Sequence, residues 1–256
     1  MAVPRGRAAV AAVRCPDARC RISSKRMHLS IIIPCLNEQD HIVSSLTRVQ
    51  TLRRSAVAEV IVVDGGSCDN TVQLAKPLVD RLIHSTPGRA LQMNRGAAEA
   101  CGDWLLFLHA DTLVPDHFES LWQRQVASSD RVWGRFDLRL SGTAWPLRVV
   151  ESLINLRSRI SGIATGDQGI FIRAGLFRRL GGFAAIPLME DVELSKRLKR
   201  EGRPLCIASQ LVTSSRHWEQ CGILKTVLLM WKLRFLYFAG VSPQRLAAQY
   251  YRRERA

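Results

Sequence analysis

The stretch His28–Cys35, HLSIIIPC, is a run of apolar and β-branched residues that includes Pro34 near its end. A continuous apolar run of this length is typical of a strand that is buried on both faces of a parallel sheet. A second such run, VAEVIVV, occupies Val57–Val63 and ends in the glycine-rich turn DGGSCDNT. Residues 39–52, between the two runs, have helical character. This order predicts a right-handed βαβ unit.

The alternation of strands and helices continues along the chain. We expect Arg81–His84 to form a short third strand, residues 88–100 a helix, and Asp103–His109 a fourth strand. The sequence therefore predicts an α/β fold with a mostly parallel, Rossmann-like sheet flanked by helices, and with further helices at the C-terminus. In such sheets ligands bind at the carboxyl ends of the strands.

Composition and charge exclude several classes of protein. The chain has 256 residues, of which 47% are hydrophobic and 23% charged, and this excludes a collagen, a coiled coil and a mainly disordered chain. The net charge is +15, but the basic side chains gather at the ends: seven lie in residues 1–26 and four in residues 241–256, each set with one acid. We therefore expect no nucleic-acid partner. Seven cysteines without a Cys-x-x-Cys pair indicate reduced thiols in a cytoplasmic protein.

Polar side chains follow three of the predicted strands. Asn37 and Glu38 come after the first strand, Asp64 after the second and Asp111 after the fourth. Carboxylates that meet at one edge of a sheet repel each other unless a cation or hydrogen-bond donors lie among them. A divalent metal, together with the sugar and base of a nucleotide, would satisfy this group.

Four motifs carry a specific resemblance. In this order and spacing, LSIIIPCLNE, VIVVDGGSCDNT, GRALQMNRGAAEACGDWLLFLHADT and LMEDVELSKRLKREG resemble the inverting family 2 glycosyltransferases, which have the nucleotide-sugar-binding A-type fold. The resemblance covers residues 29–215. GRALQMNRGA, TGDQGIF and the compact C-terminus most resemble a bacterial branch that is associated with radical-SAM enzymes and arsenosugar synthesis.

The resemblance implies an activity. It implies a metal-dependent inverting enzyme that moves a sugar from a nucleoside diphosphate, UDP or GDP, to a hydroxyl acceptor, either a lipid or a small molecule. It also implies the residues that bind the nucleotide sugar, and these are Pro34, Asn37, Glu38, Asp64, Gly65, Arg89, Asn94, Ala110 and Asp111.

Each assignment has a structural alternative. Arg89 begins a predicted helix, where a guanidinium and the first helix amides suit a diphosphate, but it could also be a solvated surface arginine. Glu38 and Asp64 could instead complement helix dipoles. HADT stands where the family has its metal-binding Asp-x-Asp motif, with His109 in place of the first acid. Asp111 is therefore the expected ligand of Mn²⁺ or Mg²⁺, with diphosphate and water oxygens as the others. We expect His109 to be structural or to contact the sugar.

The second half of the chain would serve the acceptor. The motif LMEDVELSKRLKREG contains two adjacent acids, Glu190 and Asp191. In the family the second acid of this pair is the general base, which maps to Asp191, and Glu190 would be its orienting neighbour. The alternative is that both acids only complement a helix dipole. Further contacts to acceptor or sugar are expected from residues of two short segments: Asp167, Gln168, His217 and Trp218.

Two other functions compete with this one. A nucleotidyltransferase on a similar sheet would need a glycine-rich loop with a lysine near its N-terminus, which PCLNEQDH does not offer. A basic protein that binds nucleic acid or an anionic membrane is disfavoured, because the acids at the sheet edge would repel phosphate.

The chain is expected to have three parts. Residues 1–26 form a disordered basic extension, with Met27 as the natural start, residues 27–221 form the catalytic domain, and residues 222–256 form a helical segment. Three cations, Lys225, Lys232 and Arg234, interrupt the apolar run of that last segment and disfavour a transmembrane helix. On a helix Lys225 and Lys232 would share a face, and Arg234 would project nearly opposite. The segment either packs against the catalytic domain or lies at the inner face of the cell membrane.

Overall fold

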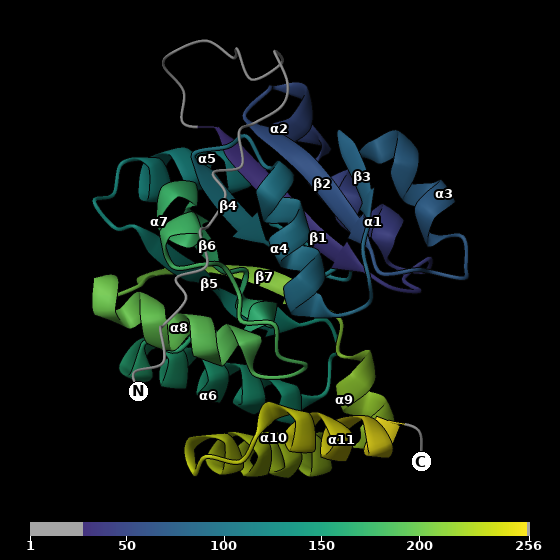
Figure 1. The fold of residues 1–256 in the computed structure, drawn as a ribbon, viewed down its shortest axis with the longest axis vertical. Coiled ribbons are helices and arrows are strands. Elements are labelled where there is room, and N and C mark those ends of the chain that lie inside the picture. The colour runs from purple at the N-terminus through teal and green to yellow at the C-terminus, as the bar shows by residue number, and fades with distance from the viewer. Residues whose placement is uncertain (1–27, 255–256) are drawn as a thin grey trace, which may run out of the picture.

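A seven-stranded sheet forms the centre of the molecule, with helices on both of its faces (Figure 1). The computed structural model describes residues 28–254, so the extension predicted for residues 1–26 lies outside the described residues. The strands are β1 (Leu29–Cys35), β2 (Ala58–Asp64), β3 (Arg81–His84), β4 (Trp104–Phe107), β5 (Trp133–Leu140), β6 (Phe171–Arg173) and β7 (Leu205–Thr213).

The helices alternate with these strands through the first half of the chain and gather at its end. The α-helices are α1 (Ile42–Arg48), α2 (Gln50–Arg54), α3 (Thr71–Ala75), α4 (Arg89–Glu99), α5 (Phe118–Leu121), α6 (Trp145–Ser161), α7 (Ala174–Arg179), α8 (Glu190–Glu201), α9 (Arg216–Cys221), α10 (Ile223–Phe238) and α11 (Pro243–Glu254). Two 3₁₀ turns, η2 (Lys76–Leu78) and η4 (Gly166–Gln168), and a π-helical turn, η3 (Trp122–Ala127), complete the described elements.

The strand order is β3-β2-β1-β4-β6-β5-β7. Strands β3, β2, β1 and β4 run parallel to one another, and β5 is parallel to β7; among pairs of the described strands, those of β6 with β4 and with β5 are antiparallel. The prediction of a mostly parallel α/β sheet is therefore confirmed. The helix expected over residues 39–52 is instead two short helices, because the amide of Val49 bonds to Leu46 three residues back and tightens the turn.

Burial on both faces explains why the first strands read as unbroken apolar runs. Alternate residues of β1 enter different cores: Ile31 and Ile33 pack with α1 and α2 on one face, while Ile32 packs against α4 on the other. Every side chain of β1 is buried, and its one hydroxyl, that of Ser30, donates a hydrogen bond to Glu59, so the strand shows no alternation of apolar and exposed polar residues. The carboxyl ends of β1, β2 and β4 then lie side by side at one edge of the sheet.

The C-terminal segment packs on the second half of the sheet. Leu233 of α10 and Leu246 of α11 are fully buried in one cluster with Val192 of α8. Figure 1 shows α10 and α11 side by side, next to α6. Among the described residues, no helix has the length and apolar character needed to cross a membrane.

Candidate active site

Asp64 and Asn37 organise the turn at the ends of β1 and β2. The carboxylate of Asp64 is 2% exposed and accepts hydrogen bonds from the amides of Gly66 and Ser67 at 3.0 to 3.2 Å. Burial opposes its charge, but these hydrogen bonds outweigh burial and lower the pKa of Asp64. The side-chain oxygen of Asn37 accepts from the amide of Cys68 at 2.9 Å, and Asn37 itself has a left-handed φ of 54°. The turn after β2 is therefore held rigidly beside the end of β1.

Glu38 lies between this turn and Asp111. Burial, followed by the charge of Asp111, raises the pKa of Glu38, while Arg216 at 3.7 Å opposes the shift. The buried Oε2 of Glu38 has no hydrogen-bond partner within the described residues. The two carboxylates therefore form a cluster whose negative charge is only partly balanced.

Asp111 is the carboxylate of this cluster that could hold a divalent cation. Asp111 accepts a hydrogen bond from the hydroxyl of Thr213 at Oδ1, at 3.2 Å, and lines the cavity described below. Within residues 28–254 no three His, Cys, Asp or Glu side chains are grouped so as to hold a metal ion. Asp111 would therefore share a cation with oxygens of a bound diphosphate and with water, an arrangement that Mg²⁺ and Mn²⁺ accept.

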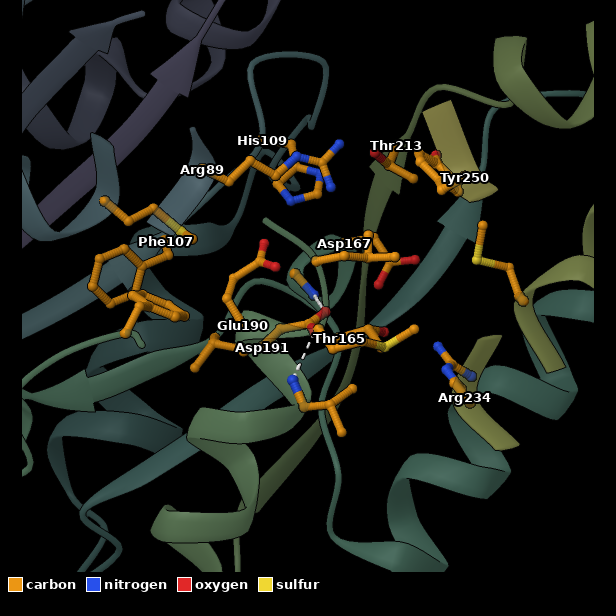
Figure 2. A pocket seen from close by; sticks show the side chains of 18 of the residues that line it. Arg89, Phe107, His109, Thr165, Asp167, Glu190, Asp191, Thr213, Arg234 and Tyr250 are labelled. Carbon is orange, nitrogen blue, oxygen red and sulfur yellow. Dashed lines mark hydrogen bonds between the residues drawn. The ribbon is translucent and has the colours of Figure 1, made fainter. Parts of the chain in front are cut away.

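A cavity of about 230 Å³ opens beside Asp111, and we call it the central cavity (Figure 2). Its walls come from the start of α4, the segment after β4, η4, the start of α8, the end of β7 and the C-terminal helices. The charged and titratable groups in it are Arg89, His109, Asp111, Asp167, Glu190, Asp191, Arg234 and Tyr250. In Figure 2, Arg89 and His109 lie side by side opposite Glu190 and Asp191.

Asp191 is fixed at the N-terminus of α8. Its Oδ2 accepts a hydrogen bond from the amide of Gly166 at 2.8 Å, and its Oδ1 accepts from the amide of Val192 at 2.6 Å. Met189, the residue before the helix, has a left-handed φ of 69°. A non-glycine residue rarely adopts this conformation, and such strain occurs preferentially at functional sites.

Glu190 and Arg89 face each other across the cavity. Burial, followed by the charge of Asp191, raises the pKa of Glu190 to about 7, and Arg89 opposes this shift. Arg89 is exposed to solvent on one side while it lines the cavity, and the carboxylates of Glu190 and Asp191 help to raise its pKa. Glu190 can thus hold or release a proton near neutral pH, while Arg89 keeps a positive charge.

His109 is a neutral group in the same wall. Burial, followed by the positive charge of Arg89, lowers the pKa of His109. The negative charges of nearby carboxylates, those of Asp111, Asp167 and Asp191, oppose this shift. A Cβ on Gly166 would lie 2.7 Å from Nε2 of His109. The absence of a side chain at Gly166 therefore lets the imidazole and the amide that binds Asp191 lie close together.

A sequence profile described as glycosyl transferase family 2 matches residues 30–178, more than half of the chain. The chain belongs to glycosyl transferase family 2.

Two curated relatives show how much of the chain is shared. It is 30% identical over 164 residues to the uncharacterized glycosyltransferase YibD of Escherichia coli (strain K12), covering 59% of this chain and 44% of that protein. It is also 30% identical over 168 residues to the PGL/p-HBAD biosynthesis glycosyltransferase of Mycobacterium bovis (strain BCG / Pasteur 1173P2), covering 60% of this chain and 62% of that protein. The chain thus spans less than two thirds of the length of either relative.

Solved structures share the fold. S. aureus TarS 1-349 in complex with UDP superposes with a TM-score of 0.60 at 18% identity, covering 73% of this chain and 60% of that one. The mannosyltransferase PcManGT from Pyrobaculum calidifontis, in complex with GDP-Man and Mn²⁺, gives a TM-score of 0.57 at 21% identity, covering 74% and 57%. The sheet and its helices therefore have the A-type fold of these glycosyltransferases, as the sequence motifs indicated.

Within this family 2 fold, the predicted site residues fall into two groups. Arg89, Asp111, Asp167, Glu190, Asp191 and Trp218 line the central cavity. Glu38 and Asp64 stand at the adjoining strand ends, together with Pro34, Asn37, Gly65 and the buried Ala110.

Three predicted residues are placed differently or are not described. Asn94 does not line the central cavity: its amide donates to the carbonyl of Phe183 and accepts from its N–H, at 2.8 and 2.9 Å. Gln168 is fully buried and closes a capping box with Thr165. The side chain of His217 lies outside the described part of the structure.

Three further residues reach the cavity that were not among the predicted site residues. Thr213 arrives at the end of β7, and Arg234 and Tyr250 arrive from α10 and α11. The stretches of sequence around Thr213, Arg234 and Tyr250 are apolar or basic and contain no recognisable motif. The interruption of the apolar run by Arg234 was the one available signal.

Proposed function

We propose that the chain is a metal-dependent inverting glycosyltransferase that moves a sugar from a UDP- or GDP-linked donor to a hydroxyl acceptor. The observation that carries this proposal is the position of Asp191. Its carboxylate is fixed by the amide of Gly166 and faces the same cavity as Arg89 and Asp111. A base and a diphosphate-binding pair on one cavity are the two parts that in-line transfer needs.

The donor half of the site is built from the strand ends. Glu38 and Asp64 are assigned to the sugar and base of the nucleotide, and Arg89 to its diphosphate. Asp111 would hold Mn²⁺ or Mg²⁺, which would supply positive charge against the charge that develops on the leaving diphosphate. The Mn²⁺ in the complex of the similar mannosyltransferase PcManGT supports this assignment.

The acceptor half needs only a base. As the acceptor oxygen forms its bond to the anomeric carbon, the hydroxyl proton passes to the carboxylate of Asp191, and the bond to the diphosphate breaks with its electron pair going to the diphosphate. Glu190, whose pKa is raised to about 7, would orient Asp191. No covalent intermediate is required.

The finer resemblance concerns the branch of the family. GRALQMNRGA and TGDQGIF support a place in the radical-SAM-associated, arsenosugar-type branch, and the relatives reported above are other members of the family. This prediction is the alternative to the lipid acceptor that is proposed below, and transfer of a sugar to a small arsenic-containing acceptor would support it.

Asp191→Asn tests the proposal. The variant should bind a UDP- or GDP-sugar with Mn²⁺ as the wild type does, but should lose transfer by a factor on the order of a hundred or more, because a carboxamide cannot accept the proton. Asp40→Asn, which changes an exposed carboxylate, is the control and should leave both unchanged. Near wild-type turnover of Asp191→Asn would overturn the assignment of the base.

A further inference from the structure

Two helices carry most of the exposed large apolar side chains. Ten of the fifteen such side chains among the described residues lie on α6 and α10. On α6 they are Trp145, Val149, Leu153, Leu156 and Ile160, and on α10 they are Leu224, Leu228, Trp231, Phe235 and Phe238. Exposed apolar groups scattered singly need no explanation, but a concentration of this kind marks an interaction surface.

Each set forms a continuous stripe. The intervals within each set are three or four residues, so the side chains lie along one side of their helix. The exposure is large: Ile160 is 78% exposed and Phe235 74%. α6 and α10 contact each other, and Figure 1 shows them at the same end of the molecule. We call the two stripes together the apolar face.

A groove of about 300 Å³ separates the two helices. Its walls are mostly apolar and include Leu153 and Ile154 from α6 and Val227 and Trp231 from α10. The groove borders the central cavity, because both are lined by the same four residues: Asp167, Trp218, Met230 and Arg234. An extended apolar chain in the groove would therefore have its head close to Asp191.

Positive charge flanks the apolar face. Lys225 and Lys232 are exposed on one side of the α10 stripe, and α10 contains no acid. The acid of α6, Glu151, is buried and paired with Arg148. The face thus presents aromatic rings and lysines without an exposed carboxylate on either helix, a combination that favours the interface of an anionic bilayer.

Two guanidinium groups line the groove, and that of Arg234 also lines the central cavity. Arg157 and Arg234 both line the groove, and Nε and Nη2 of Arg157 are buried without a hydrogen-bond partner among the described residues. Burial, followed by the charge of Arg234, lowers the pKa of Arg157 to about 10. An anionic headgroup at this point would supply the missing acceptors for hydrogen bonds.

We propose that the apolar face docks on an anionic lipid bilayer and that the groove admits the aliphatic chain of the acceptor, which is a hydroxyl-bearing anionic lipid. The second half of this statement rests on the proposed transferase function; the docking does not. The helices lie on the surface, with their apolar stripes among the headgroups and acyl chains. The acceptor remains anchored in the bilayer while its hydroxyl reaches Asp191.

A second copy of the chain is the main alternative occupant. It would bring the same lysines and no exposed acid from α6 or α10 to the contact, so the charges would not be complementary. The groove beside the central cavity would then also be closed to a substrate. A bilayer explains the stripes, the lysines and the groove together.

Vesicle binding tests the docking with the full chain. We expect it to float with vesicles of phosphatidylcholine mixed with phosphatidylglycerol, and to bind vesicles of phosphatidylcholine alone more weakly. Trp231→Ser/Phe235→Ser should weaken binding by about tenfold or more, since two exposed aromatic anchors are removed. Lys225→Glu/Lys232→Glu should abolish the preference for phosphatidylglycerol.

A matched control separates the face from general hydrophobicity. Val43→Ser/Leu74→Ser removes two exposed apolar side chains from α1 and α3 and should bind as the wild type does. Equal loss in the control, or no binding of the wild type to anionic vesicles, would overturn the docking. So would a wild-type dimer in light scattering that Trp231→Ser/Phe235→Ser converts to a monomer.

The groove is tested with dioctanoylphosphatidylglycerol below its micelle concentration. Titration calorimetry should show binding to the wild type and a severalfold loss in Leu153→Trp, whose larger side chain would narrow the groove. Absence of binding to the wild type would overturn the groove assignment. Asp191→Asn should bind both probes normally, so failure of the transferase proposal and failure of the lipid proposal give different results.

Discussion

The amide of Gly166 donates a hydrogen bond to Oδ2 of Asp191 at 2.8 Å, although the two residues are 25 positions apart. η4 is thereby tied to the start of α8, and the direction of the Asp191 carboxylate is set by a backbone group. Because Gly166 has no side chain, the ring of His109 can occupy the space beside it.

Gly166→Ala should therefore impair turnover more than stability. The new Cβ would lie 2.7 Å from Nε2 of His109, so either the imidazole or η4 must shift and the hydrogen bond to Asp191 would lengthen. We expect kcat to fall by about tenfold or more, with a small change in Tm. Gly175→Ala is the control, because nothing lies within 4 Å of its Cβ. An unchanged kcat in Gly166→Ala would contradict this account.

Glu190 should make the stability depend on pH. Its pKa is raised from 4.5 to about 7 by burial and by Asp191. A carboxyl whose folded pKa lies above its unfolded pKa stabilises the fold fully below the unfolded value, and this stabilisation is lost as pH rises through the folded value. The free energy of unfolding should therefore decrease between about pH 4.5 and 7, by up to about 3 kcal/mol.

Glu190→Gln should remove this pH dependence. The variant stays neutral at all pH values and should be more stable than the wild type above pH 7. Urea unfolding across the pH window measures the difference. Glu201→Gln changes an exposed acid of the same helix and should retain the wild-type profile. A wild type whose stability does not fall in this window would show that Glu190 is not perturbed as described.

Asp111→Asn should remove the effect of metal on nucleotide binding. With UDP or GDP and Mn²⁺ at about a hundred times Kd, the wild type should gain about 2.7 kcal/mol in unfolding free energy. The variant should lose the Mn²⁺-dependent part, since a carboxamide is a neutral and weaker ligand. Asp116→Asn, whose side chain is 86% exposed, is the control. A full Mn²⁺ effect in Asp111→Asn would place the metal elsewhere.

The first half of the fold could be predicted because its strands are buried on both faces. β3 spans Arg81–His84 as expected, and β1, β2 and β4 begin and end within two residues of their predicted bounds. β5 gave no such signal. Its sequence, WGRFDLRL, contains Arg135, which is fully buried and paired with Asp137. Because β5 contains a buried salt bridge, its sequence lacks the continuous apolar run that predicted the other strands.

The sequence motifs do not show in which direction each side chain points, and this limited the prediction of the site residues. Arg89 and Asn94 belong to one motif, but five positions along a helix rotate a side chain by roughly 140°. Arg89 therefore lines the central cavity while Asn94 bonds to Phe183. Arg234 and Tyr250 come from helices whose packing no local pattern reveals. Lys225 and Lys232 were expected on one face of their helix, with Arg234 nearly opposite, and the structure agrees: both lysines are exposed and Arg234 lines the cavity.

Of the residues in the motif GRALQMN, we expect Gln92 to contribute most to the free energy of unfolding. It is 3% exposed, and its Nε2 donates to the carbonyls of Cys35 and Val63 at 2.9 and 2.8 Å, so it joins the start of α4 to the ends of β1 and β2. Gln92→Ala would leave two buried carbonyls without this donor and should cost about 2 to 4 kcal/mol of unfolding free energy.

The same substitution should also weaken the donor half of the site. Arg89 is the first residue of α4, and its position relative to Asp64 depends on the link through Gln92. We expect Gln92→Ala to bind UDP or GDP more weakly at a temperature where it is still folded, as circular dichroism can establish. Gln123→Ala removes an exposed glutamine and should change neither stability nor binding. Nucleotide binding at wild-type strength in folded Gln92→Ala would show that α4 is positioned by its apolar contacts alone.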